Sequence, residues 1–206
     1  MKRFLCALLT TVAMLGVVPS FAQESDANES TTYRAALKKD RIGIDAGLVF
    51  PFGDIDKGLD LATSWGFNVN FWSFIGDRTI GTVTVGTNWF RLGSKVPTDS
   101  GTTVDLSDLS MTATPLLGGI GYVFGDGDLH PYVIVHGGAT FVTVNIGTNR
   151  PSEQINNQAY FTLAGTAGLG YSVSGRITIT GSTRYTKMFG EDLQTLSILF
   201  GASFLL

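Results

Sequence analysis

Apolar and polar residues alternate along most of the chain beyond residue 39. In residues 176–186, RITITGSTRYT, one side consists of Ile177, Ile179, Gly181, Thr183 and Tyr185, and the other consists of Arg176, Thr178, Thr180, Ser182, Arg184 and Thr186. A period of two predicts a β-strand with one apolar face. Eight segments share this pattern. They are residues 40–51, 63–74, 79–92, 106–124, 130–147, 159–173, 176–186 and 193–206.

Two of these segments contain residues that disturb a regular strand. Pro115 lies within residues 106–124 and predicts a bulge or another sheet irregularity, because proline cannot donate to the ladder. Gly137 and Gly138 lie within residues 130–147, where a shift in register at the glycine pair would leave the two faces ambiguous.

Long and short connections between the segments alternate along the chain. FGDIDKGLDLA, GSKVPTDSGTTVD and TNRPSEQINNQ are long, IGDR, GDGDL and SGR are short, and KMFGEDL is intermediate. Bacterial outer-membrane barrels have short periplasmic turns and longer external loops. The pattern therefore predicts an all-β protein, an eight-stranded antiparallel up-and-down transmembrane β-barrel.

The composition of the strands indicates which way their apolar faces point. The polar faces consist mainly of Gly, Ser, Thr and Asn, which suit the cramped interior of an eight-stranded barrel. Aromatic residues gather near the strand ends, as in the girdles of membrane barrels. The expected girdle residues are Trp65, Trp89 and Tyr185 near the long loops and Trp72, Tyr122 and Tyr132 near the short turns. A soluble lipocalin-like barrel that binds a small ligand is the alternative.

The start of the chain predicts export. Lys2 and Arg3 precede an apolar run that ends in the small-x-small motif of residues 20–22, so residues 1–22 are expected to be a cleaved signal peptide. Residues 23–39 are polar and are expected to be flexible, and residues 40–206 are expected to form the barrel. The single cysteine, Cys6, lies in the leader, so the exported chain would contain no disulfide.

The stretches GGIGYVFGDGDLHPYVIVHGGATF and TAGLGYSVSGRITITGSTRYTKM resemble the small outer-membrane β-barrel family of OmpA-like, OmpX-like and OmpW-like proteins. The resemblance implies the outer membrane of a Gram-negative bacterium as location, with lipid and lipopolysaccharide as partners. The apolar final strand is similar to the segment that the outer-membrane assembly machinery recognises, although Leu206 replaces the usual final Phe or Trp.

Charged and polar residues of the inner face are expected to form a structural network in the lumen, since buried charges need partners. This set comprises Asp45, Asn68, Asn70, Asn88, Arg176 and Arg184. His130 and His136 are interpreted as structural, and no catalytic residue, metal site or cofactor is expected. The exported chain is acidic and has no basic patch, so nucleic acid is not an expected partner.

The predicted function is a structural, surface-interaction or adhesion role, and the acidic loops are the candidate place for an extracellular ligand. Two alternatives remain besides the lipocalin-like barrel. A lipid-A-modifying enzyme would need an activated nucleophile, and no spacing singles one out around His136. A narrow ion pore would use the inward-facing charges.

Overall fold

The computed structural model describes the strands and short turns of the chain. The described residues are 40–53, 62–91, 96–97, 103–104, 109–125, 127–146, 153–190 and 193–206. The expected signal peptide and the polar segment 23–39 lie outside them. Within these ranges, no helix is long and apolar enough to cross a membrane.

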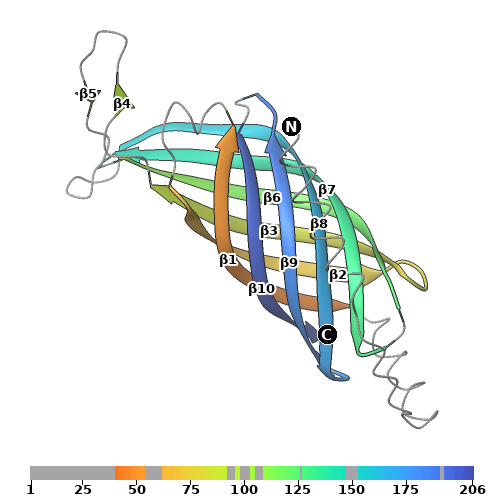
Figure 1. Ribbon diagram of the computed structural model, residues 1–206. Coiled ribbons are helices and arrows are strands. Elements are labelled where there is room, and N and C mark those ends of the chain that lie inside the picture. The colour runs from red at the N-terminus through yellow and green to blue at the C-terminus, as the bar shows by residue number, and fades with distance from the viewer. Residues whose placement is uncertain are drawn as a thin grey trace, which may run out of the picture. The chain divides into compact units, whose positions relative to one another are not determined.

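Eight long strands form one closed antiparallel barrel (Figure 1). They are β1 (Arg41–Gly53), β2 (Ser64–Phe74), β3 (Thr79–Arg91), β6 (Leu109–Val123), β7 (Leu129–Ile146), β8 (Glu153–Ser174), β9 (Ile177–Met188) and β10 (Leu193–Leu205). Around the barrel, the order is β1, β10, β9, β8, β7, β6, β3 and β2. This arrangement confirms the fold expected from the period-two pattern.

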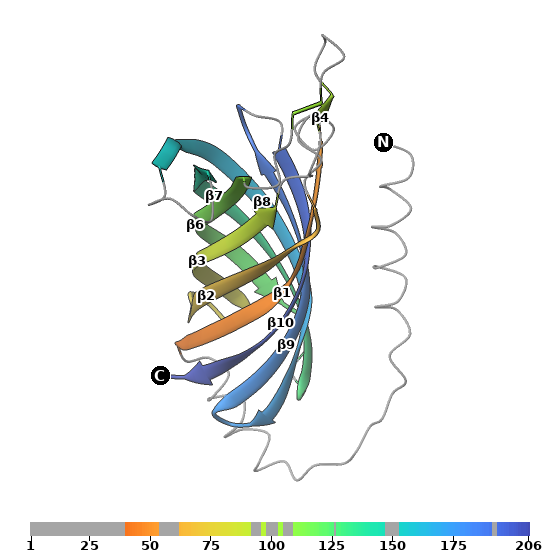
Figure 2. The ribbon, with the colours of Figure 1, turned by 90° about the vertical axis from the view of Figure 1, so that its left-hand side faces the viewer.

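The first and last strands close the barrel by pairing with each other. Arg41 of β1 lies opposite Leu205 of β10, and the pairing continues to Gly53 opposite Leu193. Figure 2 shows β1, β10 and β9 side by side along one wall. Within the described strands, the closed ladder leaves no open edge along the barrel wall between β1 and β10, as a barrel in lipid requires.

The two ends of the barrel differ in their connections. The turn residues 75–78, 124–125, 127–128 and 175–176 lie at one end, which we call the turn end, together with Asp40 and Leu206. Residues 54–63, 92–108, 147–152 and 189–192 connect the strands at the other end, the loop end. A two-stranded pair, β4 (Val96–Pro97) and β5 (Thr103–Val104), lies in the connection between β3 and β6.

The connection between β7 and β8 is shorter than the sequence predicts. β8 begins at Glu153, whereas alternation of apolar residues begins only near residue 159. Residues 153–158 are polar apart from Ile155, yet they continue the ladder with β7, where Ile146 lies opposite Glu153. The strand therefore extends past the segment that hydrophobic periodicity can detect.

The expected disturbances at Pro115 and at the glycine pair turn out differently. The β3–β6 pairs stop at Val85–Leu116 and resume at Asn88–Ala113 in the same register, so Pro115 interrupts the ladder without a bulge. The register shift expected at Gly137 and Gly138 is wrong, because β7 pairs continuously through both. The shifts lie at Val144/Asn145 and at Ser172/Ser174 instead.

Close approach of neighbouring backbones makes inward-facing glycines sensitive to substitution. A Cβ at Gly47 would overlap the main-chain carbonyl of Ile198, whereas a Cβ at the outward-facing Gly118 would meet no heavy atom within 4 Å. We expect Gly47→Ala to lower the free energy of unfolding by about 3 kcal/mol, the upper range for overpacking. Gly118→Ala should change it by less than about 0.5 kcal/mol. Urea unfolding in phospholipid vesicles measures both, and equal effects would contradict the close approach of β10 to Gly47.

Candidate functional site: outer belt and lumen network

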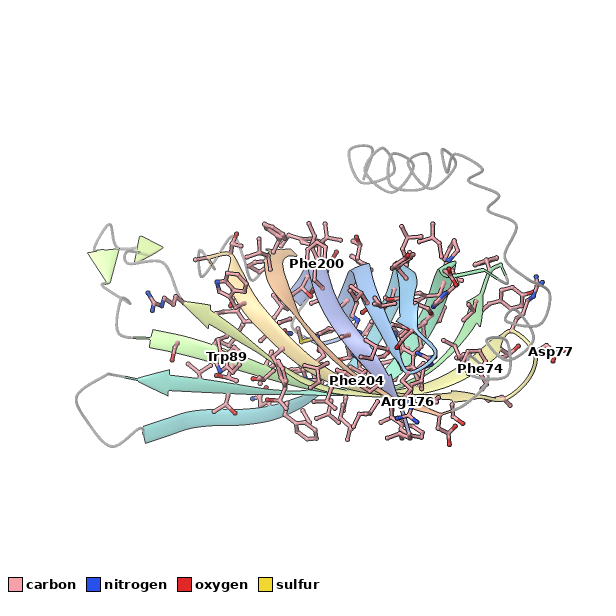
Figure 3. The ribbon with its side chains drawn as sticks, turned by 90° about the horizontal axis from the view of Figure 1, so that it is seen from below. Phe74, Asp77, Trp89, Arg176, Phe200 and Phe204 are labelled. Carbon is pink, nitrogen blue, oxygen red and sulfur yellow. The ribbon has the colours of Figure 1, made fainter. Side chains whose placement is uncertain are left out.

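The outer surface of the barrel carries large apolar side chains in direct contact with the surroundings. Phe200 is 68 % exposed, Val135 66 % and Trp65 65 %. Ile44, Val83, Ile120, Phe161 and Ile179 are among the others that face outward. Figure 3 shows such side chains along the barrel wall, with Phe200 on its outer face and Trp89 near the loop end. An apolar surface of this extent is unsuited to water and matches the lipid-facing band of a membrane barrel.

Outward-facing charges are confined to the two ends of the described strands and turns. Arg91 and Lys187 lie at the loop end of β3 and β9. Asp40, Asp77, Arg78, Asp128 and Arg176 lie at the turn end. We call the apolar band between the two ends the outer belt. No charged side chain that the structure describes faces outward within it, so none would contact hydrocarbon.

Four of the expected girdle residues lie on the outer face near strand ends. Trp65 and Trp89 are opposite one another on β2 and β3. Tyr185 stacks on Phe52 with a centroid separation of 5.9 Å, and Tyr122 contacts Phe124 edge to face at 5.0 Å. Their outward-facing rings, at the margins of the outer belt, fit the membrane–water interface.

The expected girdle positions of Trp72 and Tyr132 are wrong, because both side chains lie inside the barrel. Tyr132 is 4 % exposed and its ring meets that of Trp72 edge to face at 5.0 Å. Trp72 has the same parity on β2 as the inward-facing Asn68 and Asn70. Height along the strand suggests the girdle, but parity decides which face a side chain occupies.

Asp45 is the centre of one half of the polar interior. Its Oδ2 accepts a hydrogen bond of 2.5 Å from Asn70 Nδ2, and its Oδ1 accepts one of 3.2 Å from the Thr180 hydroxyl. Thr84 donates to Asn70 Oδ1 at 2.7 Å. The contacts join β1, β2, β3 and β9 across the lumen and compensate the half-buried carboxylate.

Arg184 is the centre of the other half. It is 6 % exposed, its Nε donates to the Thr166 hydroxyl at 3.1 Å and its Nη1 donates to Asn68 Oδ1 at 3.3 Å. Asp45 is near enough for its opposite charge to attract the guanidinium. Among the described side chains, the two ions share no direct hydrogen bond, and each is bound by an amide of its own, Asp45 by Asn70 and Arg184 by Asn68. We call the two groups of residues together the lumen network.

The structure places the other expected network residues differently. Arg176 is exposed in the turn between β8 and β9, so its assignment to the lumen is wrong; it lies one residue before β9 begins. Asn88 and Arg184 both line a small cavity of about 10 Å³, roughly the space for one water molecule.

Arg41 and His136 belong to the polar interior without being members of the expected network. Arg41 is buried, and its Nη1 donates to the Thr178 hydroxyl at 2.6 Å. It has the same parity as Asp45, which is the signal that could have identified it. His136 contacts the Thr166 hydroxyl through Nε2 at 3.1 Å. Its inward direction is the one expected from the sequence and follows from the regular parity of β7.

Apolar side chains pack inside the barrel on both sides of the lumen network. Val49, Phe90, Met111, Ala113, Met188 and Leu193 cluster toward the loop end. Ile80, Val123, Tyr132 and Ile134 cluster toward the turn end, with Trp72 and Phe74 against them. The described interior is thus filled by apolar clusters toward both ends and by polar side chains, as expected for so narrow a barrel.

Both histidines of the chain are enclosed. His136 is 1 % exposed and His130 is also buried in the lumen. Neither reaches the lipid-facing surface, where a lipid-A-modifying enzyme would need its base. Within the described residues, His, Cys, Asp and Glu side chains do not gather in groups of three that could hold a metal ion.

Comparison with solved structures gives the fold independently. The Neisserial surface protein A (NspA) matches with a TM-score of 0.58 and 11% identity, over 81% of this chain and 97% of that chain. OprG from Pseudomonas aeruginosa matches with a TM-score of 0.53 and 12% identity, over 82% of this chain and 98% of that chain. Ail, the attachment invasion locus protein of Yersinia pestis, matches with a TM-score of 0.51 and 16% identity, over 82% of this chain and 99% of that chain. No protein-family model and no curated protein matches the sequence.

These similarities confirm the expected resemblance at the level of the fold. OprG is described as an outer membrane protein, and the alignments cover nearly the whole of each solved chain. The chain has the fold of the small outer-membrane β-barrels.

The lumen network predicts strong coupling between its charges. Asp45→Leu or Arg184→Met should each lower the free energy of unfolding by about 3–5 kcal/mol, because each leaves the other ion uncompensated in the interior. The double variant should lose less than the sum of the single losses. Urea unfolding in vesicles measures the cycle, with Arg176→Met as a control that changes stability by less than about 0.5 kcal/mol. Additive losses would contradict the coupling.

The outer belt predicts a depth-dependent cost for an added charge. Phe200→Arg, near the middle of β10, should lower the free energy of unfolding by about 2–4 kcal/mol in a bilayer, while Phe189→Arg at the loop end should cost about 1 kcal/mol or less. Equal costs at the two positions, measured by the same unfolding experiment, would argue against a lipid-facing belt.

Proposed function

We propose that the chain is an integral protein of the Gram-negative outer membrane, with a filled lumen and a structural, surface-interaction or adhesion role. One observation carries the proposal. The outer face of the strands exposes large apolar side chains such as Phe200 and Val135. Asp45 and Arg184 point into the lumen and are hydrogen-bonded there. This distribution is inverted relative to a water-soluble barrel and suits lipid outside.

The filled interior supports a role at the surface of the protein. Phe90, Met111 and Met188 pack across the lumen on the loop side of Arg184, and the cavity next to Arg184 has space for about one water molecule. A continuous path for a solute would require these side chains to move. We therefore assign the function to the loops and to the outer surface, with lipid and lipopolysaccharide as the first partners.

The proposal assigns no catalytic activity to the barrel. His130 and His136 are the only histidines of the chain, and both are enclosed. The acidic residues of the connecting loops, including Asp54, Asp99 and Glu191, lie outside the described residues. They remain the proposed place for an extracellular ligand.

Cell fractionation and gel migration test the proposal. We expect the full chain, expressed in a Gram-negative host, to fractionate with the outer membrane and to migrate differently before and after boiling, because a closed barrel resists unfolding by detergent. An epitope inserted directly after residue 99 should be detected on intact cells. A product that is periplasmic and monodisperse without detergent would overturn the membrane assignment and favour the lipocalin-like barrel.

Surface expression then allows the adhesion role to be measured. Cells that display the protein should bind host-cell surfaces more strongly than cells that display a variant with residues 98–102 replaced by a Gly-Ser linker of equal length. Equal binding of the two strains would exclude adhesion through that loop and leave a structural role.

A further inference from the structure

A group of hydrogen-bond donors lies on the outer face at the loop end of β9 and β10. Tyr185 and Lys187 are successive outward-facing residues of β9, and Lys187 lies directly opposite Gln194 of β10. The Tyr185 hydroxyl donates to Gln194 Oε1 at 2.9 Å. Because this bond uses the amide oxygen of Gln194, its NH₂ group remains a donor, on the residue that is paired with Lys187.

Aromatic rings frame these donors on both sides. The Lys187 ammonium lies 5.5 Å from the centroid of the Phe189 ring, and that ring lies 5.6 Å from the ring of Phe161. On the other side, Tyr185 stacks on Phe52. A cation held among aromatic rings at the margin of an apolar belt lies at the level of lipid headgroups.

We propose that Tyr185, Lys187 and Gln194 form a binding site for the phosphate of a phosphorylated glycolipid, lipid A, in the outer leaflet. The inference rests on the proposed outer-membrane location, which places the loop end in that leaflet. The ammonium and the amide NH₂ group supply charge and donors for a phosphate, and the neighbouring rings keep the site at the boundary of hydrocarbon and water. A freely soluble anion has no need of the aromatic frame.

The barrel wall on the turn side of this site has room for acyl chains. Gly165 and Ala167 of β8 and Thr183 of β9 are neighbouring outward residues, and a Cβ at Gly165 would meet no heavy atom within 4 Å. Val135 lies opposite Gly165 on β7. The small residues leave a shallow surface beside exposed apolar side chains, where the acyl chains of a bound lipid can lie. The donors would bind its headgroup.

Charged side chains that the structure describes lie at both ends of the outer belt. At the loop end, the described outward-facing charges are the cations Arg91 and Lys187. At the turn end, Asp40, Asp77 and Asp128 accompany Arg78 and Arg176. Of the two described cations at the loop end, Lys187 is the one with an aromatic ring under its ammonium and a paired amide on the next strand.

Native mass spectrometry of the refolded full chain in zwitterionic detergent tests the site, with synthetic diphosphoryl lipid A as probe. Lys187→Gln should weaken the binding of lipid A about fivefold, the effect of one basic residue at a membrane surface. Lys187→Arg should bind within about twofold of the unaltered chain, because the charge and donors are kept. Arg176→Gln at the turn end and Arg91→Gln on β3 make the same change of charge and should leave the affinity within about twofold.

Two further probes separate the sources of phosphate. Dephosphorylated lipid A should bind the unaltered chain and Lys187→Gln equally weakly, and inorganic phosphate at about 10 mM, in large excess over the lipid, should not displace lipid A. Displacement by inorganic phosphate would overturn the lipid assignment in favour of a soluble anion. Unchanged affinity in Lys187→Gln, or an equal loss in Arg91→Gln, would overturn the site.

A gel-shift control distinguishes this outcome from failure of the proposed function. Each variant should keep the heat-dependent migration of the folded barrel, since Lys187, Arg91 and Arg176 are at the outer surface. A folded outer-membrane barrel without the fivefold effect would refute the lipid site alone. A chain that is soluble without detergent would refute the proposed function as well.

Discussion

The hydrogen bonds between β1 and β10 close the ladder, and the rest of the structure depends on that closure. Lipid offers a backbone no hydrogen-bond partner, so a strand can cross a bilayer only when neighbours on both sides satisfy it. Pairing of Arg41–Gly53 with Leu193–Leu205 supplies the last of these neighbours. Once the wall is closed, alternation along each strand separates an outer surface exposed to lipid from an interior that contacts only the protein.

Closure around eight strands leaves an interior that side chains must fill. Small residues allow neighbouring backbones to approach, as at Gly47 beside Ile198. Polar residues then have to satisfy one another, and Asp45 and Arg184 do so through Asn68, Asn70, Thr166 and Thr180. Amide and hydroxyl groups suit both ions because they can donate to the carboxylate and accept from the guanidinium. The apolar clusters on either side keep this network away from water.

Period-two alternation is enough to predict the strand count, the antiparallel fold and the outward direction of residues such as Ile179 and Phe200. Errors arise where another criterion replaces parity. Height near a turn suggests a girdle position for Trp72 and Tyr132, although both share parity with inward-facing residues. Arg176 continues the alternation of its strand by one residue, but a two-residue turn already occupies that position. The polar start of β8 follows from backbone pairing, which hydrophobic periodicity does not report.

The partners of each buried charge could not be predicted from the sequence because closure brings distant residues together. Asp45 and Thr180 are far apart in the chain, and their contact depends on the register of β1 with β10 and of β10 with β9. A shift of one residue at either ladder would turn one of the side chains toward lipid. The same dependence constrains where new function can arise. The interior residues specify register and fill the lumen, so recognition can vary most freely at the loop end and on the outer rim, where the side chains of Lys187 and Gln194 point away from the lumen.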